Sequence, residues 1–199
     1  MEGPLDARAR WDARYAGRDA PPGPASRYLT ERAHLLPITG RALDVAGGIG
    51  RHALWLAQRG LAVTLVDVSG VALEQAARAA AAAARPLEVL RSDLSTDPLP
   101  EGPFDVVLVH HYLDLAVWRS LPARLAGGGV LLVCHPTVRN LDRHDRPSRR
   151  FLLPEHAAVE VAADLAAGDP HLEVLEATEG WTDEGRHEAH IVVRRRPVG

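Results

Sequence analysis

Short apolar runs alternate with helical stretches along most of the 199-residue chain. Five runs are rich in Val and Leu and have the length of strands; they span residues 41–46, 61–67, 87–93, 104–110 and 129–135. Such near-continuous apolar runs are typical of parallel strands that are buried on both faces. Helical stretches lie between most of them, at 50–59, 69–84 and 114–125. The alternation predicts an α/β fold with a parallel sheet and right-handed crossovers.

The pattern changes after the fifth apolar run. Residues 136–150 are polar and Arg-rich and predict a long loop, and residues 153–168 predict a helix with Pro154 near its start. Two closing strands, 171–181 and 186–196, are joined by a short turn and predict a hairpin. The last strand should therefore run antiparallel to the first five. At the other end of the chain, a helical segment near 5–17 precedes a proline-rich connector.

Composition narrows the class of protein. With 46% hydrophobic and 25% charged residues, the chain has the length of a single domain, so we expect one domain over 1–199. A net charge of -3 gives no basis for binding nucleic acid with the whole surface. The lone Cys134 cannot form an internal disulfide and is expected to be a buried small hydrophobe. Neither a signal segment nor a membrane span is visible, so we expect a cytoplasmic protein.

A glycine turn follows the first predicted strand. Residues 48–53 read Gly-Ile-Gly-Arg-His-Ala, which matches the dinucleotide-binding pattern G-x-G-x-x-G/A. A strand before the turn and a helix after it favour a nucleotide-like ligand at the carboxyl end of the sheet. The alternative is a turn that serves packing alone. The pattern by itself does not separate NAD from another nucleoside ligand.

Three predicted strands end in or near an acidic residue: Asp44, Asp67 and Asp93. A carboxylate at Asp44 would repel a pyrophosphate and attract a ligand with an ammonium or sulfonium group. Asp67 is placed to bind ribose hydroxyls, and Asp93 offers an acceptor for an adenine amino group. Each acid alone could equally be a helix cap or a solvated loop residue. Together they favour S-adenosylmethionine over NAD.

The motif Asp44-Val45-Ala46-Gly47-Gly48-Ile49-Gly50 resembles the first motif of class I S-adenosylmethionine-dependent methyltransferases, with Ala46 in place of the first glycine. The resemblance covers nearly the whole chain. It implies a single-domain Rossmann-like fold, with helices on both faces of a seven-stranded, mostly parallel sheet whose last strand is antiparallel. The segments "WDARYAG" and "GWTDEGRHEAHIVVRRR" resemble small stand-alone members, including the tellurite-resistance methyltransferase group.

The resemblance also implies which residues bind S-adenosylmethionine and release S-adenosylhomocysteine. The implied cofactor-binding residues are Asp44, Ala46, Gly47, Gly48, Gly50, Asp67, Val68, Asp93, Leu94 and His110. Trp11 and Tyr15 would belong to an N-terminal lid within residues 1–25. The alternative for both aromatic residues is that they only attach a helix to the domain.

Methyl transfer from a sulfonium needs alignment more than acid catalysis, and a base helps only if the acceptor carries a proton. Base candidates are His111 and His110, which should point in opposite directions on an extended strand. We prefer His111, because the resemblance puts His110 beside the cofactor. Candidate substrate contacts are Tyr112, His135, Arg139 and Arg143, the two arginines lying in the substrate-side loop 136–150. Packing roles, or a solvated loop paired with acidic neighbours, are the alternatives.

No metal site is expected, because no histidine pair has helical i, i+4 spacing with an acidic partner and no cysteine cluster exists. The predicted function is methyl transfer from S-adenosylmethionine to a small molecule, with an acidic or oxyanionic acceptor as one hypothesis. An NAD(P)-dependent oxidoreductase and a non-catalytic cofactor-binding protein are the alternatives. The expected partner is the small-molecule substrate, without nucleic acid or membrane, and the expected state is a monomer or homodimer.

Overall fold

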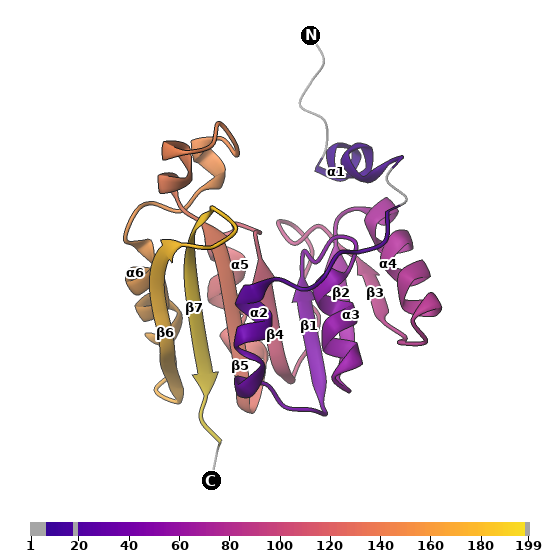
Figure 1. Cartoon of the computed structure of the whole chain (residues 1–199). Coiled ribbons are helices and arrows are strands. Elements are labelled where there is room, and N and C mark those ends of the chain that lie inside the picture. Colours follow the sequence, from indigo (N-terminus) through magenta and orange to yellow (C-terminus); the bar gives the residue numbers. More distant parts are fainter. Residues whose placement is uncertain (1–6, 18–19, 198–199) are drawn as a thin grey trace. The chain divides into compact units, whose positions relative to one another are not determined.

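The computed structural model describes residues 7–17 and 20–197 (Figure 1). Contacts between residues group the chain into two compact units, 1–101 and 102–199. The strand β7 is antiparallel to both of its neighbours, β5 and β6, whereas the other strand pairs within each unit are parallel. The predicted α/β class, with seven strands and an antiparallel last strand, is therefore confirmed.

The first unit contains three parallel strands in the order β3-β2-β1. They are β1 (Arg41–Val45), β2 (Ala62–Asp67) and β3 (Glu88–Arg91). Its helices are α1 (Ala7–Tyr15), α2 (Arg27–Glu31), α3 (Arg51–Gln58) and α4 (Gly70–Ala82), with a 3₁₀ turn at Ala33–Leu35. The Ser69 side chain accepts a hydrogen bond from the Ala72 backbone N–H and so caps α4.

One expectation for this unit is wrong: the run at 87–93 is not buried on both faces. All four residues of β3 are exposed, including Val89 and Leu90. β3 is the terminal strand in the order β3-β2-β1, so an apolar run alone did not distinguish an edge strand from a central one. β1 and β2, by contrast, are buried except at their first residues.

The second unit contains four strands in the order β4-β5-β7-β6. They are β4 (Phe104–His110), β5 (Leu125–Pro136), β6 (Leu172–Trp181) and β7 (His187–Arg195), and β7 is antiparallel to both β5 and β6. The helices are α5 (Leu115–Ser120) and α6 (Ala157–Ala166), with 3₁₀ turns at Pro122–Arg124, Val138–Asp142 and Arg149–Phe151. The hairpin prediction is thus confirmed.

Two predicted elements of this unit differ from the observed ones. The stretch at 114–125 is a helix only to Ser120, and Pro122 then begins a separate 3₁₀ turn. Residues 136–150 are not a plain loop, because a 3₁₀ turn forms where the Thr137 hydroxyl accepts a hydrogen bond from the Arg139 backbone N–H. The Asn140 amide donates to the Thr137 carbonyl and braces the same turn. Local side-chain hydrogen bonds therefore order a segment whose polar composition indicated a loop.

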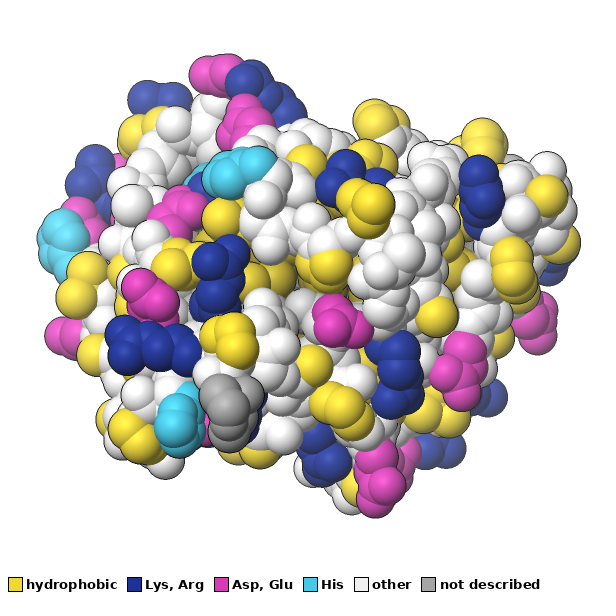
Figure 2. Space-filling model, turned by 90° about the horizontal axis from the view of Figure 1, so that it is seen from below, with side chains coloured by type: hydrophobic (Ala, Val, Ile, Leu, Met, Phe, Trp, Pro, Cys, Tyr) yellow, Lys and Arg dark blue, Asp and Glu magenta, His cyan; other side chains and the backbone are white. Residues whose placement is uncertain are grey.

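The surface carries charges of both signs. On the face seen in Figure 2, basic, acidic and apolar side chains are interspersed. In the residues that the structure describes, no helix has the length and apolar character needed to cross a bilayer.

Candidate functional site

The glycine turn after β1 requires unusual backbone angles. Gly48 and Gly50 have φ values of 59° and 81°, and Gly50 stands at the start of α3. These are left-handed conformations that glycine adopts without steric cost. Ala46, which replaces the family's first glycine, also has a positive φ of 54°. An alanine in this region is strained by about 1–2 kcal/mol, so the replacement is accommodated at a cost.

Asp67 holds the glycine turn against the start of α4. Its two carboxylate oxygens accept hydrogen bonds from the backbone N–H groups of Gly48 and Ser69, each at 2.8 Å. Burial raises the pKa of Asp67, and these backbone hydrogen bonds oppose that rise. A carboxylate has about four acceptor positions. Asp67 therefore retains capacity to accept hydrogen bonds from ligand hydroxyls.

Asp44 is the least satisfied charged group of the first unit. Its side chain is fully buried, and neither carboxylate oxygen has a hydrogen-bond partner among the residues that the structure describes. Burial raises the pKa of Asp44 to about 7, and the charge of Asp67 adds to the rise, while the nearby Ala53 backbone N–H and the charge of Arg51 oppose it. A β-carbon on Gly47 would lie 2.5 Å from one Asp44 oxygen, so the turn passes directly over this carboxylate. An unpaired buried carboxylate is costly unless a cation or donor approaches it.

The acid after β3 has a local role. Asp93 is half-buried, and its Oδ1 accepts hydrogen bonds from the Ser95 backbone N–H and hydroxyl. Leu94 beside it is buried, and Val68 after β2 is half-buried. Asp93 thus caps a turn, which is a local role of the kind that the alternative for this residue describes.

Helix α1 packs on the glycine turn and on α4. Asp12 accepts hydrogen bonds from the Ser69 hydroxyl at 2.7 Å and the Val71 backbone N–H at 3.2 Å. The Tyr15 hydroxyl lies 2.7 Å from the point where a β-carbon on Gly48 would stand. The Trp11 ring stacks on Tyr15 with centroids 6.0 Å apart. This packing puts both aromatic residues at the glycine turn. That position is compatible with a lid over the cofactor and equally with a role in attaching α1 to the domain.

In the second unit, β4 ends in two adjacent histidines whose rings lie together. The centroids of His110 and His111 are 4.0 Å apart, so the expectation that they point in opposite directions is wrong. The physical reason is that His111 leaves the extended conformation, with φ at 62°. Alternation of side chains holds only along a continuous strand.

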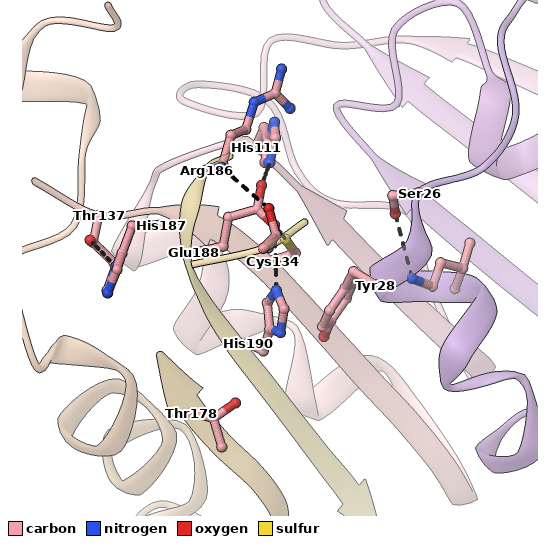
Figure 3. A network of polar contacts seen from close by, with 12 residues as sticks. Ser26, Tyr28, His111, Cys134, Thr137, Thr178, Arg186, His187, Glu188 and His190 are labelled. Atoms are coloured by element: carbon pink, nitrogen blue, oxygen red, sulfur yellow. Dashed lines mark hydrogen bonds and ion pairs between the residues drawn. The ribbon is translucent and has the colours of Figure 1, made fainter. Parts of the chain in front are cut away.

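Glu188 on β7 is the centre of a polar cluster (Figure 3). Its Oε1 lies 2.8 Å from His111 Nε2, and its Oε2 lies 3.3 Å from Cys134 Sγ and 3.4 Å from His190 Nε2. Burial would raise the pKa of this carboxyl, but hydrogen bonds from His111, His190 and Cys134 hold it well below its usual range. Glu188 is therefore a buried carboxylate that stays ionised.

His135 does not lie at the rim where a substrate contact was expected. It is buried, its Nε2 donates to the Phe151 carbonyl at 3.0 Å, and its ring meets Trp118 edge-on. Burial lowers the pKa of His135 to about 4. A neutral imidazole among aromatic and backbone groups has the features of a packing residue.

The other candidate substrate contacts have protein partners. The Tyr112 carbonyl accepts a hydrogen bond from the Trp118 indole. Arg139 pairs with Asp142 at 2.7 Å and with Glu155 at 2.8 Å, and the guanidinium of Arg143 lies 3.7 Å from the centroid of the Trp181 ring. The pairing of Arg139 with Asp142 agrees with the alternative of a loop neutralised by its own acids.

Sequence reasoning missed Asp12, Glu188 and His190. A signal for the last two existed, since they occupy alternate positions of one strand, next to its apolar residues 191–193, and so share one face. Asp12 gave no comparable signal, because its partner Ser69 is 57 residues away.

Known proteins resemble this chain in sequence and in fold. Residues 42–127 match the family model of the methyltransferase domain. This range includes the glycine turn and the three acids at the strand ends. This stretch of the chain is therefore similar to a methyltransferase domain, in agreement with the predicted resemblance to class I S-adenosylmethionine-dependent methyltransferases. A comparison with curated protein sequences gives no match.

Solved structures resemble the methyltransferase domain in fold. One comes from work on the conversion of a disulfide bond into a thioacetal group during echinomycin biosynthesis; it is 21% identical, with a TM-score of 0.70 over 96% of this chain and 92% of its own. An S-adenosylmethionine-dependent methyltransferase from Clostridium acetobutylicum is 13% identical, with a TM-score of 0.63 over 84% and 89%. TehB from Haemophilus influenzae is 18% identical, with a TM-score of 0.67 over 85% and 61%.

The cofactor of this methyltransferase domain is S-adenosylmethionine. The residues present fit it, because Asp44 is a buried carboxylate without a partner and the cofactor carries an ammonium and a sulfonium. Gly47 and Gly48 leave no room for side chains at the turn that the cofactor would approach.

Proposed function

We propose that the protein transfers a methyl group from S-adenosylmethionine to a small molecule. The observation that carries the proposal is Asp44, fully buried beside the glycine turn with both oxygens unpaired. A pyrophosphate at this turn would meet a like charge, whereas a cationic ligand would relieve the cost of the buried carboxylate. The charge of Asp44 therefore favours a sulfonium nucleoside over NAD as the ligand.

We assign the cofactor contacts of the first unit by chemistry. Asp44 pairs with the cationic end of the cofactor, and Asp67 accepts hydrogen bonds from the ribose hydroxyls while it holds Gly48. Asp93 and Leu94 border the adenine. Ala46, Gly47, Gly50 and Val68 complete the contacts of this unit, and Trp11 and Tyr15 form the lid. The family resemblance adds the backbone at His110, which belongs to the second unit. These roles are part of the proposal.

We assign the deprotonation of the methyl acceptor to residues of the second unit. Bound S-adenosylmethionine supplies an electrophilic methyl group on a cationic sulfur. His111 takes the acceptor's proton: its Nε2–H donates to Glu188, which leaves Nδ1 as the basic nitrogen. Glu188 fixes the tautomer and the ring orientation of His111, as a carboxylate partner commonly does for a catalytic histidine. His110 is the second candidate for this role.

The class of acceptor is the least constrained part of the proposal. Arg139 is held by Asp142 and Glu155, so the structure offers less support for an oxyanionic acceptor than the Arg-rich sequence did. The side chains of His135 and Arg143 have protein partners as well. We therefore propose an acceptor atom that carries a proton at neutral pH, such as a thiol or a phenol. We also propose that 1–199 acts as one cytoplasmic domain, as a monomer or homodimer.

Calorimetric titration with S-adenosylmethionine, S-adenosylhomocysteine and NAD tests the cofactor proposal. We expect the first two to bind and NAD not to bind. Asp67→Ala should lose most of the affinity, by at least about tenfold, because two or more hydrogen bonds to a charged group are removed. Glu74→Ala, at an exposed position of α4, is the control. Tight NAD binding would reject the proposal, and unchanged affinity in Asp67→Ala would reject the ribose assignment.

The role of His111 is tested on acceptors. A panel of thiols, phenols, amines, carboxylic acids and tellurite is incubated with methyl-labelled S-adenosylmethionine to find one that is methylated. On that acceptor, His111→Gln should lower kcat by about 10²–10⁴-fold, the usual contribution of general base catalysis. The affinity for S-adenosylmethionine should stay unchanged. His171→Gln, at an exposed position, is the control, and an unaltered kcat in His111→Gln would remove the base role.

A further inference from the structure

Four side chains with metal-binding groups gather on three neighbouring strands of the second unit. His110 on β4 is in register with Cys134 on β5, and Cys134 is in register with His190 on β7. Register partners on adjacent strands face the same side of a sheet. Glu188 lies two residues before His190 and so shares that face. The row brings together an imidazole, a thiol, a second imidazole and a carboxylate.

The distances between the donor atoms of these side chains match those between the ligands of a tetrahedral zinc ion. Cys134 Sγ lies 3.3 Å from Glu188 Oε2, and His190 Nε2 lies 3.4 Å from the same oxygen. Tetrahedral zinc, with bonds of about 2.0–2.3 Å, places its ligand atoms about 3.3–3.5 Å apart. All three ligand atoms lie within 4.8 Å of one another. A single ion can therefore contact them with small side-chain shifts.

We propose that Cys134 Sγ, Glu188 Oε2 and His190 Nε2 bind a divalent transition-metal ion of the zinc class. Three protein ligands leave a fourth position open, as in zinc sites that hold a water molecule or a substrate atom. His110 and His111 lie nearby, because their nitrogens fall within 4.8 Å of Cys134 Sγ and of each other. The proposed ion would lie beside His111, the candidate base for methyl transfer, but its binding can be measured without cofactor or acceptor.

The two carboxylate oxygens of Glu188 contact different partners. Oε2 faces the thiol and His190, while Oε1 accepts a hydrogen bond from His111 at 2.8 Å. In metal sites a hydrogen bond to the second oxygen commonly fixes the orientation of a ligating carboxylate. His111 would supply that support without binding the ion. Cys134 and Glu188 are buried and His190 is half-buried, so the site is protected from bulk water.

The donor set decides the kind of ion. A thiolate and an imidazole favour Zn²⁺ or Co²⁺ over Mg²⁺ and Ca²⁺, which prefer oxygen ligands. On binding, the Cys134 thiol loses its proton to water and the thiolate forms the bond to the ion, so no oxidant or reductant takes part. Glu188 binds as the carboxylate that it already is. Binding therefore releases one proton and weakens as the pH falls.

The competing interpretation is a hydrogen-bonded cluster without an ion. In that case the Cys134 thiol and the His190 imidazole both donate to Glu188. A bond between the Cys134 thiolate and a metal ion forms only in the first interpretation, and this bond can be measured.

The test uses the untagged full chain, dialysed against a chelator and titrated with Co²⁺. We expect one Co²⁺ per chain and a near-ultraviolet thiolate-to-cobalt charge-transfer band, displaced by Zn²⁺ and not by Mg²⁺. Because the chain has a single cysteine, that band reports on Cys134 alone. Co²⁺ binding without the band, or no binding above that of a surface histidine, would overturn the proposal.

Variants locate the ligands. Cys134→Ser should abolish the band, and Glu188→Gln and His190→Gln should each weaken Co²⁺ binding by about tenfold or more. His187→Gln is the matched control, since His187 lies on the same strand but bonds to Thr137 instead. Retained affinity for S-adenosylmethionine shows that a variant is folded. If all three variants bind Co²⁺ as the unaltered chain does, the assigned ligands are wrong, and the band in the unaltered chain decides the case for any variant that fails to fold.

Discussion

At the scale of single residues, Asp44 shows how a binding site can cost stability. The carboxylate has neither solvent nor a hydrogen-bond partner among the described residues, and burial raises its pKa from 3.8 to about 7. The folded protein thus holds a proton that the unfolded chain releases between these pH values. Stability from this group is full below about pH 4 and is lost as the pH rises through 7.

Asp44→Asn should separate stability from binding. Without cofactor, the unfolding free energy of the unaltered protein should fall by up to about 4 kcal/mol more than that of the variant between pH 4 and pH 8. Affinity for S-adenosylmethionine should meanwhile decrease about tenfold to hundredfold, because the charge that pairs with the cofactor is gone. Urea unfolding and calorimetry at both pH values measure the two effects. Glu74→Gln is the control, and parallel pH profiles for Asp44→Asn and the unaltered protein would contradict the prediction.

At the scale of elements, helix α1 is attached to the first unit mainly by polar contacts. None of its residues is buried, yet Asp12 bonds to the Ser69 hydroxyl and the Val71 N–H at the start of α4 and pairs with Arg91 at 3.1 Å. The hydrogen bond from Ser69 is the largest of the effects that lower the pKa of Asp12. An acid at a helix N-terminus is also favoured by the helix dipole. Asp12 is therefore a main polar anchor of α1, together with the hydrogen bond from the Gln75 amide to the Tyr15 carbonyl.

Asp12→Ala should release α1 from the glycine turn. We expect trypsin to cleave after Arg14 several-fold faster, because the helix loses its anchor to α4. If α1 is the lid, affinity for S-adenosylmethionine should fall as well, whereas a helix that only packs would leave it unchanged. Mass spectrometry of timed digests and calorimetry give the two readouts. Arg10→Gln, at an exposed position of the same helix, is the control, and equal cleavage rates in both variants would reject the anchoring role.

At the scale of the whole molecule, the chemistry is divided between the two halves of the chain. Residues 1–101 carry the glycine turn and the three acids that we assign to the cofactor. Residues 102–199 carry His111, the Glu188 cluster and the proposed metal ligands. The charged side chains are mixed in sign, and the net charge is only -3. The chemistry therefore depends on these local groups and not on the overall charge of the molecule.

Local patterns in the sequence determined the class of fold and the cofactor turn. The strands β1, β2 and β4, the glycine turn and the Ser69 cap all follow from short-range periodicity, backbone preference and capping, which neighbouring residues suffice to set. The match of residues 42–127 to the methyltransferase domain covers this same part.

Tertiary structure alone decided the rest. That β3 is an exposed edge, that His135 is buried and that Cys134 meets Glu188 depends on strand order and register. Glu188 and Cys134 are 54 residues apart in sequence, and only the antiparallel pairing of β5 with β7 brings them together. The search for histidine pairs at helical i, i+4 spacing could not find this cluster. Its residues meet across neighbouring strands, and such contacts depend on how distant segments of the chain align.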